Sequence, residues 1–478
     1  MTRLFRSPWF AVALLALAWL FAPPVLAAAP LFAGSTTSLV DLDSAMKIYF
    51  NDPIVENVVT DAELLNLFLY DNNVQYEKTT GGRFIETAQY FALPTGVGAR
   101  ARGEYIPVPE GPNIKNSKIL LKKLQGVVEM EGDVMARVRT DIGAYVDWME
   151  RALPDLVTRL NDAVDRMLLG YGAGILGRVN KAVPDTTLPV DTAYGATLGG
   201  VPLTQAWLNF LENDRVVFSA NPTGAPLRNA GANQSARIVN IDPDATGGSI
   251  IIDALPTGVL DNDYIFMGDG AGSSNQTAAG DDREIMGLLG MVDDGTILAT
   301  FQNLARGTYR LWKSIVIDGS DATLDNNAGF NGVLSEELLT FADDQTMVLG
   351  GGKPDMIVTS RYGLRSYWKS LKTDRAINDP RAYQGGKGPV SVIFGDRTVQ
   401  LKATRKMSPQ LAFLLQTNTF KRWELDGFQW DDKTGAIWNR VTDGVGRKDA
   451  FFAVGNWYIQ TGNLAPRKSC RIHNIGVA

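Results

Sequence analysis

Residues 131–169 read EGDVMARVRTDIGAYVDWMERALPDLVTRLNDAVDRMLL, and they carry the strongest periodic signal in the chain. Apolar residues recur there in steps of four, four and three, which places them in one stripe on a single amphipathic helix. At about 1.5 Å of rise per residue this helix would extend on the order of 55 Å. Pro154 lacks a backbone donor, so we expect the helix to bend or to divide in two there. The stripe consists of Val134, Val138, Ile142, Tyr145, Met149, Leu153, Leu156, Leu160, Val164 and Met167.

Upstream of this helix the sequence predicts an extended hairpin. Residues 83–92 and 118–130 are typical of strands, and residues 94–116 form a polar connection rich in glycine and proline. An isolated two-stranded hairpin is marginally stable in water, so we expect this one to rest on a neighbouring subunit or domain. Gly96, Gly98 and Gly103 do not make a phosphate-binding loop, because the Gly-Lys-Ser/Thr ending and the strand-to-helix context are missing.

Downstream of the helix the sequence becomes rich in short strands. Four strands separated by turn residues predict a small sheet or a barrel-like insertion. Residues 242–253 superficially match a calcium-binding loop, but strands flank them and Asp253 replaces the bidentate glutamate, so a hairpin turn is favoured. The four expected strands are residues 215–220, 236–241, 249–253 and 264–268.

From Ser335 onward the pattern favours a layered α+β region. Ser335 is a typical N-cap, and Glu336 and Glu337 follow it in the first helical turn. A helix, a strand and a second helix in succession imply helices packed on a sheet. Residues 411–420 suit a strand as well as a helix that opens at Ser408. The other expected elements are helices 335–349 and 361–371 and strands 356–359, 390–394, 398–403, 450–459 and 470–475.

The composition of the chain excludes several classes of site. The 478 residues include one cysteine, Cys470, and one histidine, His473, so an intrachain disulfide, a thiolate zinc cage and a multi-histidine metal site are excluded. We expect His473 to be an ordinary strand or tail residue. The 46 basic and 52 acidic residues give a net charge of −6, so we expect no nucleic-acid groove, which would require a local basic surplus.

The first thirty residues have the order of a secretory signal peptide. Arg3 and Arg6 precede an uncharged run, and the small residues 27–29 follow it. The uncharged stretch 8–30 has 23 residues, the length of a membrane span, but Pro23 and Pro24 disfavour a spanning helix. Export and an upstream reading frame attached by the start-site assignment both remain open on this evidence.

The order of these elements is recognisable as a whole. An N-terminal arm, a long two-stranded excursion, one very long helix, a β-rich insertion, a helix-strand-helix layer and a closing β segment follow one another. In this order the chain resembles the major capsid protein of tailed double-stranded DNA phages, the HK-type capsid fold, from about Thr36 to Val477. The local pieces that carry the likeness are Gly96-Val-Gly98 with Glu104-Tyr-Ile-Pro107, the junction 124–135, Arg310-Leu-Trp312-Lys, residues 351–355 before Met356-Ile-Val-Thr-Ser360, Phe451-Phe-Ala-Val-Gly-Asn456-Trp-Tyr, and Leu464-Ala-Pro466 before Arg471-Ile.

The resemblance implies an α+β fold with an N-terminal arm, an extended β-hairpin loop, a long spine helix and a mixed α/β axial domain that carries the β-rich insertion. It divides the chain into consecutive parts within one interleaved subunit. These are the leader 1–30, the arm 31–75, the extended loop 76–130, the peripheral domain with the spine helix 131–185, the axial domain 186–385 with its insertion at about 214–270, and the closing β segment 386–478.

The function implied by the resemblance is structural, with no enzymatic activity and with no catalytic, cofactor-binding or metal-binding residues. Many copies, as hexamers and pentamers, would form an icosahedral shell around phage double-stranded DNA. Portal and scaffolding proteins are expected partners, and the mature shell would hold no membrane. The acidic net charge suits a container that does not bind its DNA tightly. The implied assembly contacts are Arg83, Phe84, Glu104, Tyr105, Lys118, Met135 and Trp148.

The expected location is the virion, after assembly in the cytoplasm of a bacterial host. Export would contradict this location, so the resemblance favours the start-site explanation of residues 1–30. One alternative keeps the fold and makes the protein the shell of an encapsulin-like compartment.

Another alternative takes the leader at face value and predicts an exported β-rich binding protein or a carboxylate-dependent hydrolase. Neighbouring acids on a strand point to opposite faces, and in turns they are commonly solvated, which weighs against a hydrolase. The acid pairs that a hydrolase would use are Asp281-Asp282, Asp293-Asp294, Asp343-Asp344 and Asp431-Asp432.

Overall fold

The structure is a computed structural model, and its described residues all belong to the compact unit Ser35–Ala478. The expected leader, most of the expected arm and the first half of the expected spine helix lie outside the described residues. The described residues are 64, 75–78, 84–132, 148–229, 234–243, 247–268, 283–327, 329–374, 390–395, 397–425, 427–432, 436–443 and 446–476.

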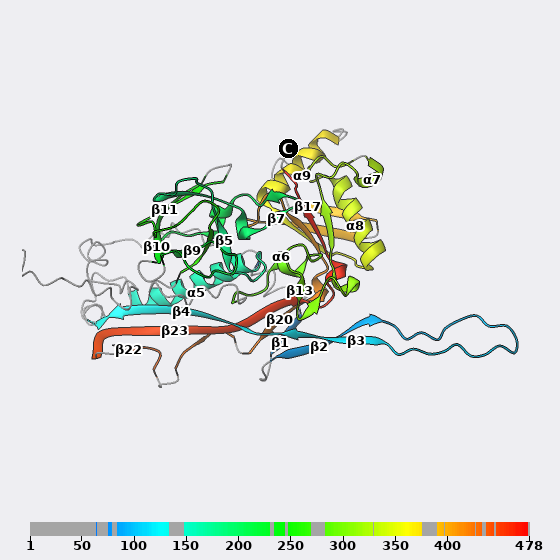
Figure 1. The fold of residues 1–478 in the computed structure, drawn as a ribbon, viewed down its shortest axis with the longest axis horizontal. Helices are drawn as coiled ribbons and strands as arrows, with labels where there is room; N and C mark the ends of the chain where they lie inside the picture. The colour runs from blue at the N-terminus through cyan, green and yellow to red at the C-terminus, as the bar shows by residue number, and fades with distance from the viewer. Residues whose placement is uncertain are drawn as a thin grey trace, which may run out of the picture. The chain divides into compact units, whose positions relative to one another are not determined.

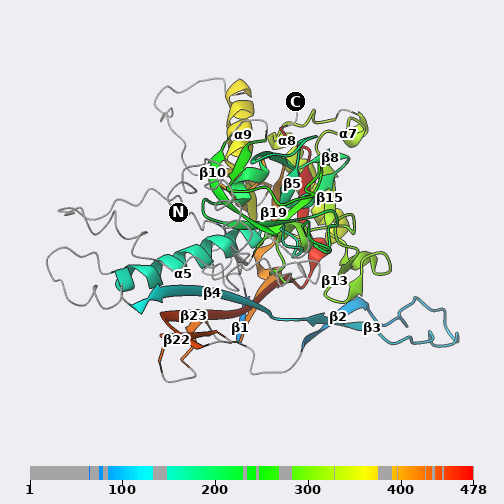
Figure 2. The same cartoon turned by 60° about the vertical axis from the view of Figure 1, so that its left-hand side comes forward.

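Helix α5, Trp148–Met167, lies within the range expected to form the long helix and runs through Pro154 without dividing. Residues 133–147 of the expected helix lie outside the described residues. Helix α5 lies along strand β4, Lys122–Glu131, in both views of the fold (Figures 1 and 2). Gly126 of β4 faces Leu156, and the stripe residues Leu160 and Val164 are buried. The apolar stripe therefore packs one face of the helix into the core, as its period predicts.

Strand β23, Gly446–Asn463, is the centre of the sheet beneath α5. It pairs antiparallel with β4 along ten residues, and with β20, Phe420–Glu424, at its other end. The sheet is completed by β1, Gln75–Lys78, which runs parallel to β20, and by β21, Gln429–Trp430, and β22, Asn439–Asp443. The expected closing strand 450–459 is confirmed and is longer than predicted.

The expected strand 118–130 is wrong as a single element, because two strands with different partners share this region. Strand β3, Asn113–Ile119, pairs antiparallel with β2, Ile85–Ala92, and forms the hairpin. Strand β4 begins at Lys122 and belongs to the sheet of β23 instead. The chain changes sheets at Leu120, so the apolar run across that residue belongs to two different surfaces.

A closed six-stranded barrel follows α5, in the order β10-β11-β6-β5-β12-β9. Its interior is filled by aliphatic and aromatic side chains such as Leu176, Phe218 and Ile250, all without solvent exposure. The four strands expected between residues 214 and 270 are present, and β5 and β6 add two strands before that range. The hairpin of β10 and β11 replaces the calcium loop. The strands are β5 Ile175–Val179, β6 Thr187–Asp191, β9 Arg215–Ser219, β10 Ser235–Asp242, β11 Ser249–Ile252 and β12 Tyr264–Met267.

A second six-stranded sheet has the order β15-β24-β19-β16-β18-β17 and packs against helices α8 and α9. Ser335 caps α8 as predicted, because its hydroxyl accepts a hydrogen bond from the backbone N–H of Leu338 at 3.2 Å. His473 ends β24 and is a strand residue, as expected. The elements are β15 Ile315–Asp318, α8 Glu336–Gly350, β16 Met356–Ser360, α9 Arg361–Asp374, β17 Val390–Phe394, β18 Arg397–Thr404, β19 Ala412–Leu415 and β24 Cys470–His473.

The range 411–420 supplies two strands of different sheets. Its first part is β19, and its end joins β20 after a short 3₁₀ turn at Thr417–Thr419. The alternative of a helix opening at Ser408 is therefore wrong. The remaining short elements are β7 Thr197–Leu198, β8 Val201–Pro202, α6 Leu288–Met291, β13 Thr300–Phe301, β14 Leu304–Ala305 and α7 Leu324–Asn327.

Within the described residues, no helix is both long and apolar enough to cross a bilayer. The domain boundaries expected from the sequence stay a prediction.

Candidate assembly surface

The hairpin of β2 and β3 has two faces of different character. Its inner face is turned toward the protein, and Ser117 and Ile119 on it are buried. Its outer face, which we define by the cross-strand pairs Glu86–Lys118, Ala88–Asn116 and Tyr90–Ile114, is exposed. Side chains alternate between the two faces of a strand, so every second residue of β2 reaches the outer face.

The outer face carries polar contacts at one end and apolar side chains at the other. The Lys118 ammonium lies 3.4 Å from the Glu86 carboxylate and 5.7 Å from the centre of the Phe84 ring. At the end nearer the connecting loop, the Tyr90 side chain is 66% exposed and its partner Ile114 is 40% exposed. An exposed ion pair contributes little to stability, so this face is held in shape mainly by the strand ladder.

The connecting loop, residues 93–112, continues beyond the ends of β2 and β3 (Figure 1). At its base the backbone N–H of Thr95 donates to the carbonyl oxygen of Glu110 at 3.1 Å. Near its tip the Glu104 carboxylate accepts from the backbone N–H of Ala101 at 3.0 Å, and the intervening Gly103 has φ +89°. That backbone conformation favours glycine, because it lies in the left-handed region.

Apolar side chains line this loop without cover from the described part of the chain. A soluble monomer rarely presents a long run of such residues, and an exposed apolar surface commonly marks an interaction site. The loop is therefore the strongest candidate surface for contact with another molecule. Its exposed apolar residues are Leu93 at 79%, Val97 at 99%, Tyr105 at 94%, Ile106 at 88% and Val108 at 82%.

The structure places the residues expected at assembly contacts in two groups. Phe84 and Lys118 lie together at the base of the hairpin, where the Lys118 ammonium stands over the aromatic ring. Glu104 and Tyr105 lie together in the exposed loop. Trp148 is the first described residue of α5. Arg83 and Met135 lie outside the described residues, and a role in assembly stays a prediction for all seven.

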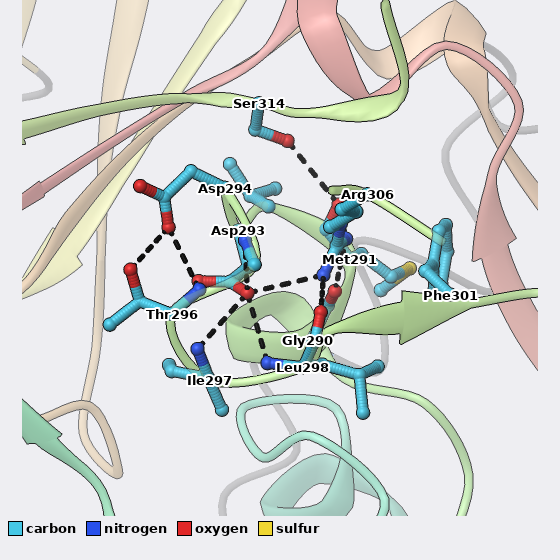
Figure 3. Close-up of polar contacts among 12 residues, drawn as sticks. Gly290, Met291, Asp293, Asp294, Thr296, Ile297, Leu298, Phe301, Arg306 and Ser314 are labelled. Carbon is cyan, nitrogen blue, oxygen red and sulfur yellow. Dashed lines mark hydrogen bonds and ion pairs between the residues drawn. The ribbon is translucent and has the colours of Figure 1, made fainter. Parts of the chain in front are cut away.

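The acid pair Asp293-Asp294, a candidate for hydrolytic chemistry, has a structural role instead (Figure 3). The Asp293 side chain has no solvent exposure, and its Oδ2 accepts hydrogen bonds from the backbone N–H groups of Gly295 at 2.9 Å and Leu298 at 3.0 Å. Its two carboxylate oxygens also contact two arginines, with Oδ2 3.2 Å from Arg306 Nη1 and Oδ1 3.1 Å from Arg471 Nη1.

Burial dominates the electrostatics of this buried cluster, which we define as Asp293, Arg306 and Arg471. Loss of hydration lowers the pKa of Arg306 to about 10, although Asp293 opposes the shift. Burial likewise lowers the pKa of Arg471. The neighbouring carboxylate of Asp294 is turned to a different partner and accepts from the Thr296 backbone N–H at 3.0 Å. An acid surrounded by donors and arginines in this way is suited to hold structure and is closed to substrate.

The other acid pairs lie in different surroundings where the structure describes them. Asp343 is buried against Arg397, while Asp281 and Asp282 lie outside the described residues. Asp431 and Asp432 follow β21 and are at least partly exposed. Among the residues that the structure describes, no group of three or more His, Cys, Asp or Glu side chains is arranged to hold a metal ion.

Sequence reasoning missed the residues that join the hairpin to the rest of the protein. Phe91 of β2 stacks on Tyr309, with ring centroids 4.7 Å apart, and makes an edge-to-face contact with Trp312 at 6.0 Å. The only local signal was the alternation of β2, which puts Phe91 on the inner face. The segment 310–313 stood out for its likeness to capsid proteins, but nothing in it pointed to Phe91.

Comparison with solved structures supports the fold, whereas comparison of the sequence finds no match. No family model and no curated protein matches the sequence. Among solved structures, the cyanophage A-1(L) capsid asymmetric unit matches with a TM-score of 0.50 and 11% identity, over 90% of this chain and 96% of that one. The chain therefore has the fold of a phage capsid protein, and the fold class predicted from the sequence is confirmed.

Two further solved structures are similar at lower scores. A chain of Microbacterium phage Oxtober96 has a TM-score of 0.42 and 12% identity, over 92% of this chain and 99% of that one. A chain of the holo-SrpI encapsulin complex from Synechococcus elongatus has a TM-score of 0.37 and 9% identity, over 92% of this chain and 96% of that one.

Proposed function

We propose that this chain is the major capsid subunit of a tailed phage, a structural protein that self-assembles into an icosahedral shell around double-stranded DNA. The observation that carries the proposal is the loop 93–112, whose apolar side chains are bare in the isolated subunit of a chain with a capsid fold. Burying such side chains stabilises an interface by roughly 25 cal/mol for each Å² of apolar area. A neighbouring copy of the same chain would supply that cover.

Repetition of one contact is sufficient to build a closed shell. Each copy offers the same loop and the same receiving surface, so a contact between unlike surfaces passes from copy to copy and closes by rotation into a ring. Hexamers and pentamers of this kind are the expected building units. Portal and scaffolding proteins are the expected partners, the host cytoplasm is the expected site of assembly, and the virion is the final location.

The DNA inside the shell would be enclosed without sequence-specific binding. The chain has a net charge of −6, whereas tight DNA binding depends on neutralising phosphates with lysine and arginine. The buried cluster uses two of the arginines internally, where they are inaccessible to a polymer. No catalytic step is part of this function.

The test is particle formation by the purified protein. We would produce the chain from Met1 and from Leu31, each with and without the scaffolding protein of the same genome, and examine both by size-exclusion chromatography and negative-stain electron microscopy. Closed particles tens of nanometres across are expected. Monomers and small oligomers alone, at high concentration and with scaffold present, would contradict the proposal.

The contents of native particles provide the second half of the test. Particles purified from infected or induced cells should contain nuclease-protected double-stranded DNA. Particles that contain one enzyme and no DNA would contradict the phage shell and would indicate an encapsulin-like compartment instead. A mature chain cleaved near Ala29 and recovered from the periplasm would contradict assembly in the cytoplasm.

A further inference from the structure

The hairpin of β2 and β3 contacts one segment of the protein, Phe301–Trp312, at two separate points. The first is a hydrogen bond at the base of the hairpin, where the backbone N–H of Lys118 donates to the carbonyl oxygen of Gln302 at 2.9 Å. The second is an aromatic contact, in which the Phe91 ring stacks on Tyr309 with a centroid distance of 4.7 Å and an interplanar angle of 29°. The edge of Trp312 meets the same Phe91 ring at 6.0 Å and 68°.

A β-bulge lies at Phe91, which the alternation of β2 places on the inner face. The register of β2 against β3 shifts between Tyr90 and Ala92, which leaves Phe91 as the extra residue of the ladder. Bulges of this kind redirect a side chain and bend the strand locally. The Phe91 ring is partly buried against the core, whereas the neighbouring Tyr90 side chain is 66% exposed on the outer face.

The two contacts are separated along the hairpin, so together they can fix its direction. Lys118 pairs with Glu86, five residues before Phe91 on β2. At about 3.4 Å of rise per strand residue, the two points are roughly 17 Å apart along the hairpin. A rod held at one point pivots, whereas a rod held at two separated points keeps its direction. The aromatic contact is the point nearer to the exposed loop.

The segment that receives both points is itself held firmly. The Trp312 indole N–H donates to the carbonyl oxygen of Phe301 at 3.0 Å, which joins the two points to each other. Arg306 lies 4.9 Å from the centre of the Phe301 ring and donates to the carbonyl oxygen of Gly290 at 2.7 Å. The same arginine contacts Asp293 (Figure 3), and through Asp293 it is linked to Arg471 of β24, in the second sheet.

We propose that Phe91 and Tyr309 are positioning residues that set the direction in which the hairpin presents the loop 93–112 to the next copy of the chain. The importance of that direction rests on the proposed function. The contact itself is a property of the single subunit. The two statements are therefore measured separately.

The first measurement is a distance distribution within the unassembled full-length subunit. Spin labels are attached at Leu93→Cys, just beyond the aromatic contact of Phe91, and at Thr340→Cys on α8, in a background of Cys470→Ser. Double electron-electron resonance should give a narrow distribution for this parent. Phe91→Ala and Tyr309→Ala should each lose the narrow peak, and Phe91→Tyr and Tyr309→Phe should restore it, because both keep the stacked rings.

The matched control is Tyr90→Ala, which removes a ring of the same kind from the adjacent residue on the outer face. It should leave the distribution unchanged. A narrow peak that persists in both Phe91→Ala and Tyr309→Ala would overturn the positioning role. Circular dichroism of each variant shows whether it is folded, and Tyr309→Phe/Phe91→Tyr together provide a folded comparison if an alanine variant fails.

The second measurement is the rate and yield of closed particles from the same variants. Phe91→Ala should lose yield, and Phe91→Tyr should recover it. Parental yield from a variant with a broadened distribution would overturn the importance of direction for assembly. If the parent itself forms no particles, the proposed function fails, and the distance distributions still decide whether Phe91 and Tyr309 fix the hairpin.

Discussion

Arg306 Nη1 lies 3.2 Å from Asp293 Oδ2, and neither side chain has any exposure to solvent. The carboxylate also meets Arg471, so one buried negative charge stands between two buried positive charges. The arginines come from distant parts of the sequence, one from the turn after β14 and the other from β24. Asp293 therefore links the segment Phe301–Trp312, which contacts the hairpin, to the second sheet.

Removing the charge of Asp293 should destabilise the subunit strongly. Asp293→Asn removes the carboxylate that contacts both buried guanidinium groups, and breaking a buried ion pair in this way typically costs about 3–5 kcal/mol. The free energy of unfolding of the unassembled subunit, measured in guanidinium chloride, checks this value. Asp294→Asn is the matched control, and a loss of equal size in both variants would contradict the role of the buried cluster.

The single histidine should make the subunit less stable in mild acid. Burial, foremost, and the nearby Arg471 lower the pKa of His473 below its usual value of about 6.5. The unfolded chain therefore binds a proton at His473 more readily than the folded chain does. The free energy of unfolding should fall as the pH drops below about 6.5, because protonation then favours the unfolded state. The NMR signal of this one imidazole should titrate with a midpoint below that of a model peptide. A midpoint above it would refute the prediction, and the acid sensitivity should be smaller in His473→Asn.

Polar substitutions in the exposed loop should impair assembly without unfolding the subunit. Tyr105 and Ile106 are 94% and 88% exposed, so the double variant Tyr105→Ser/Ile106→Ser should change the free energy of unfolding by no more than about 0.5 kcal/mol. Particle yield, followed by light scattering, should fall. Val183→Ser, which changes a 78% exposed residue in the connection between β5 and β6, should leave the yield unchanged. Parental yield in the loop variant would exclude the loop from the interface.

Gly287 should not tolerate a side chain. A Cβ atom there would lie 2.4 Å from the carbonyl oxygen of Met167 and 2.5 Å from that of Gly170, and backbone atoms have little freedom to move. Overpacking of this kind typically costs about 1–3 kcal/mol, so Gly287→Ala should lower the melting temperature of the subunit. Gly307→Ala, where nothing lies within 4 Å, serves as the control. Equal melting temperatures for both variants would show that the close approach at Gly287 relaxes freely.

The elements with a strong local pattern were predictable from the sequence. The cap at Ser335, the alternation of β2 and the period of α5 each express a physical preference that a short window contains. Strands β5 and β6 were missed because Gly177 and Pro189 interrupt their patterns, and the barrel supplies the missing ladder partners. The break between β3 and β4 was missed because their partners lie on different sheets.

The candidate surface was predictable in part for the same reason. Glycine and proline between two strands marked the exposed loop, in which the Tyr105 side chain is 94% exposed, and its role in assembly stays a prediction. The contacts of Phe91 with Tyr309 and of Asp293 with Arg471 join residues more than 170 positions apart. Periodicity and composition carry no information about such pairs, because the sequence around each residue does not indicate which distant residue it contacts.

The place of β23 along the chain affects how the protein is made. Residues 122–131 and 450–459 are neighbours in the sheet although more than three hundred residues separate them. While the ribosome is still synthesising that intervening stretch, β4 has no strand to pair with, and long-range pairing of this kind forms slowly. The nascent chain must therefore keep β4 and the loop before it from premature association. A subunit becomes ready to join others only after synthesis has passed residue 463.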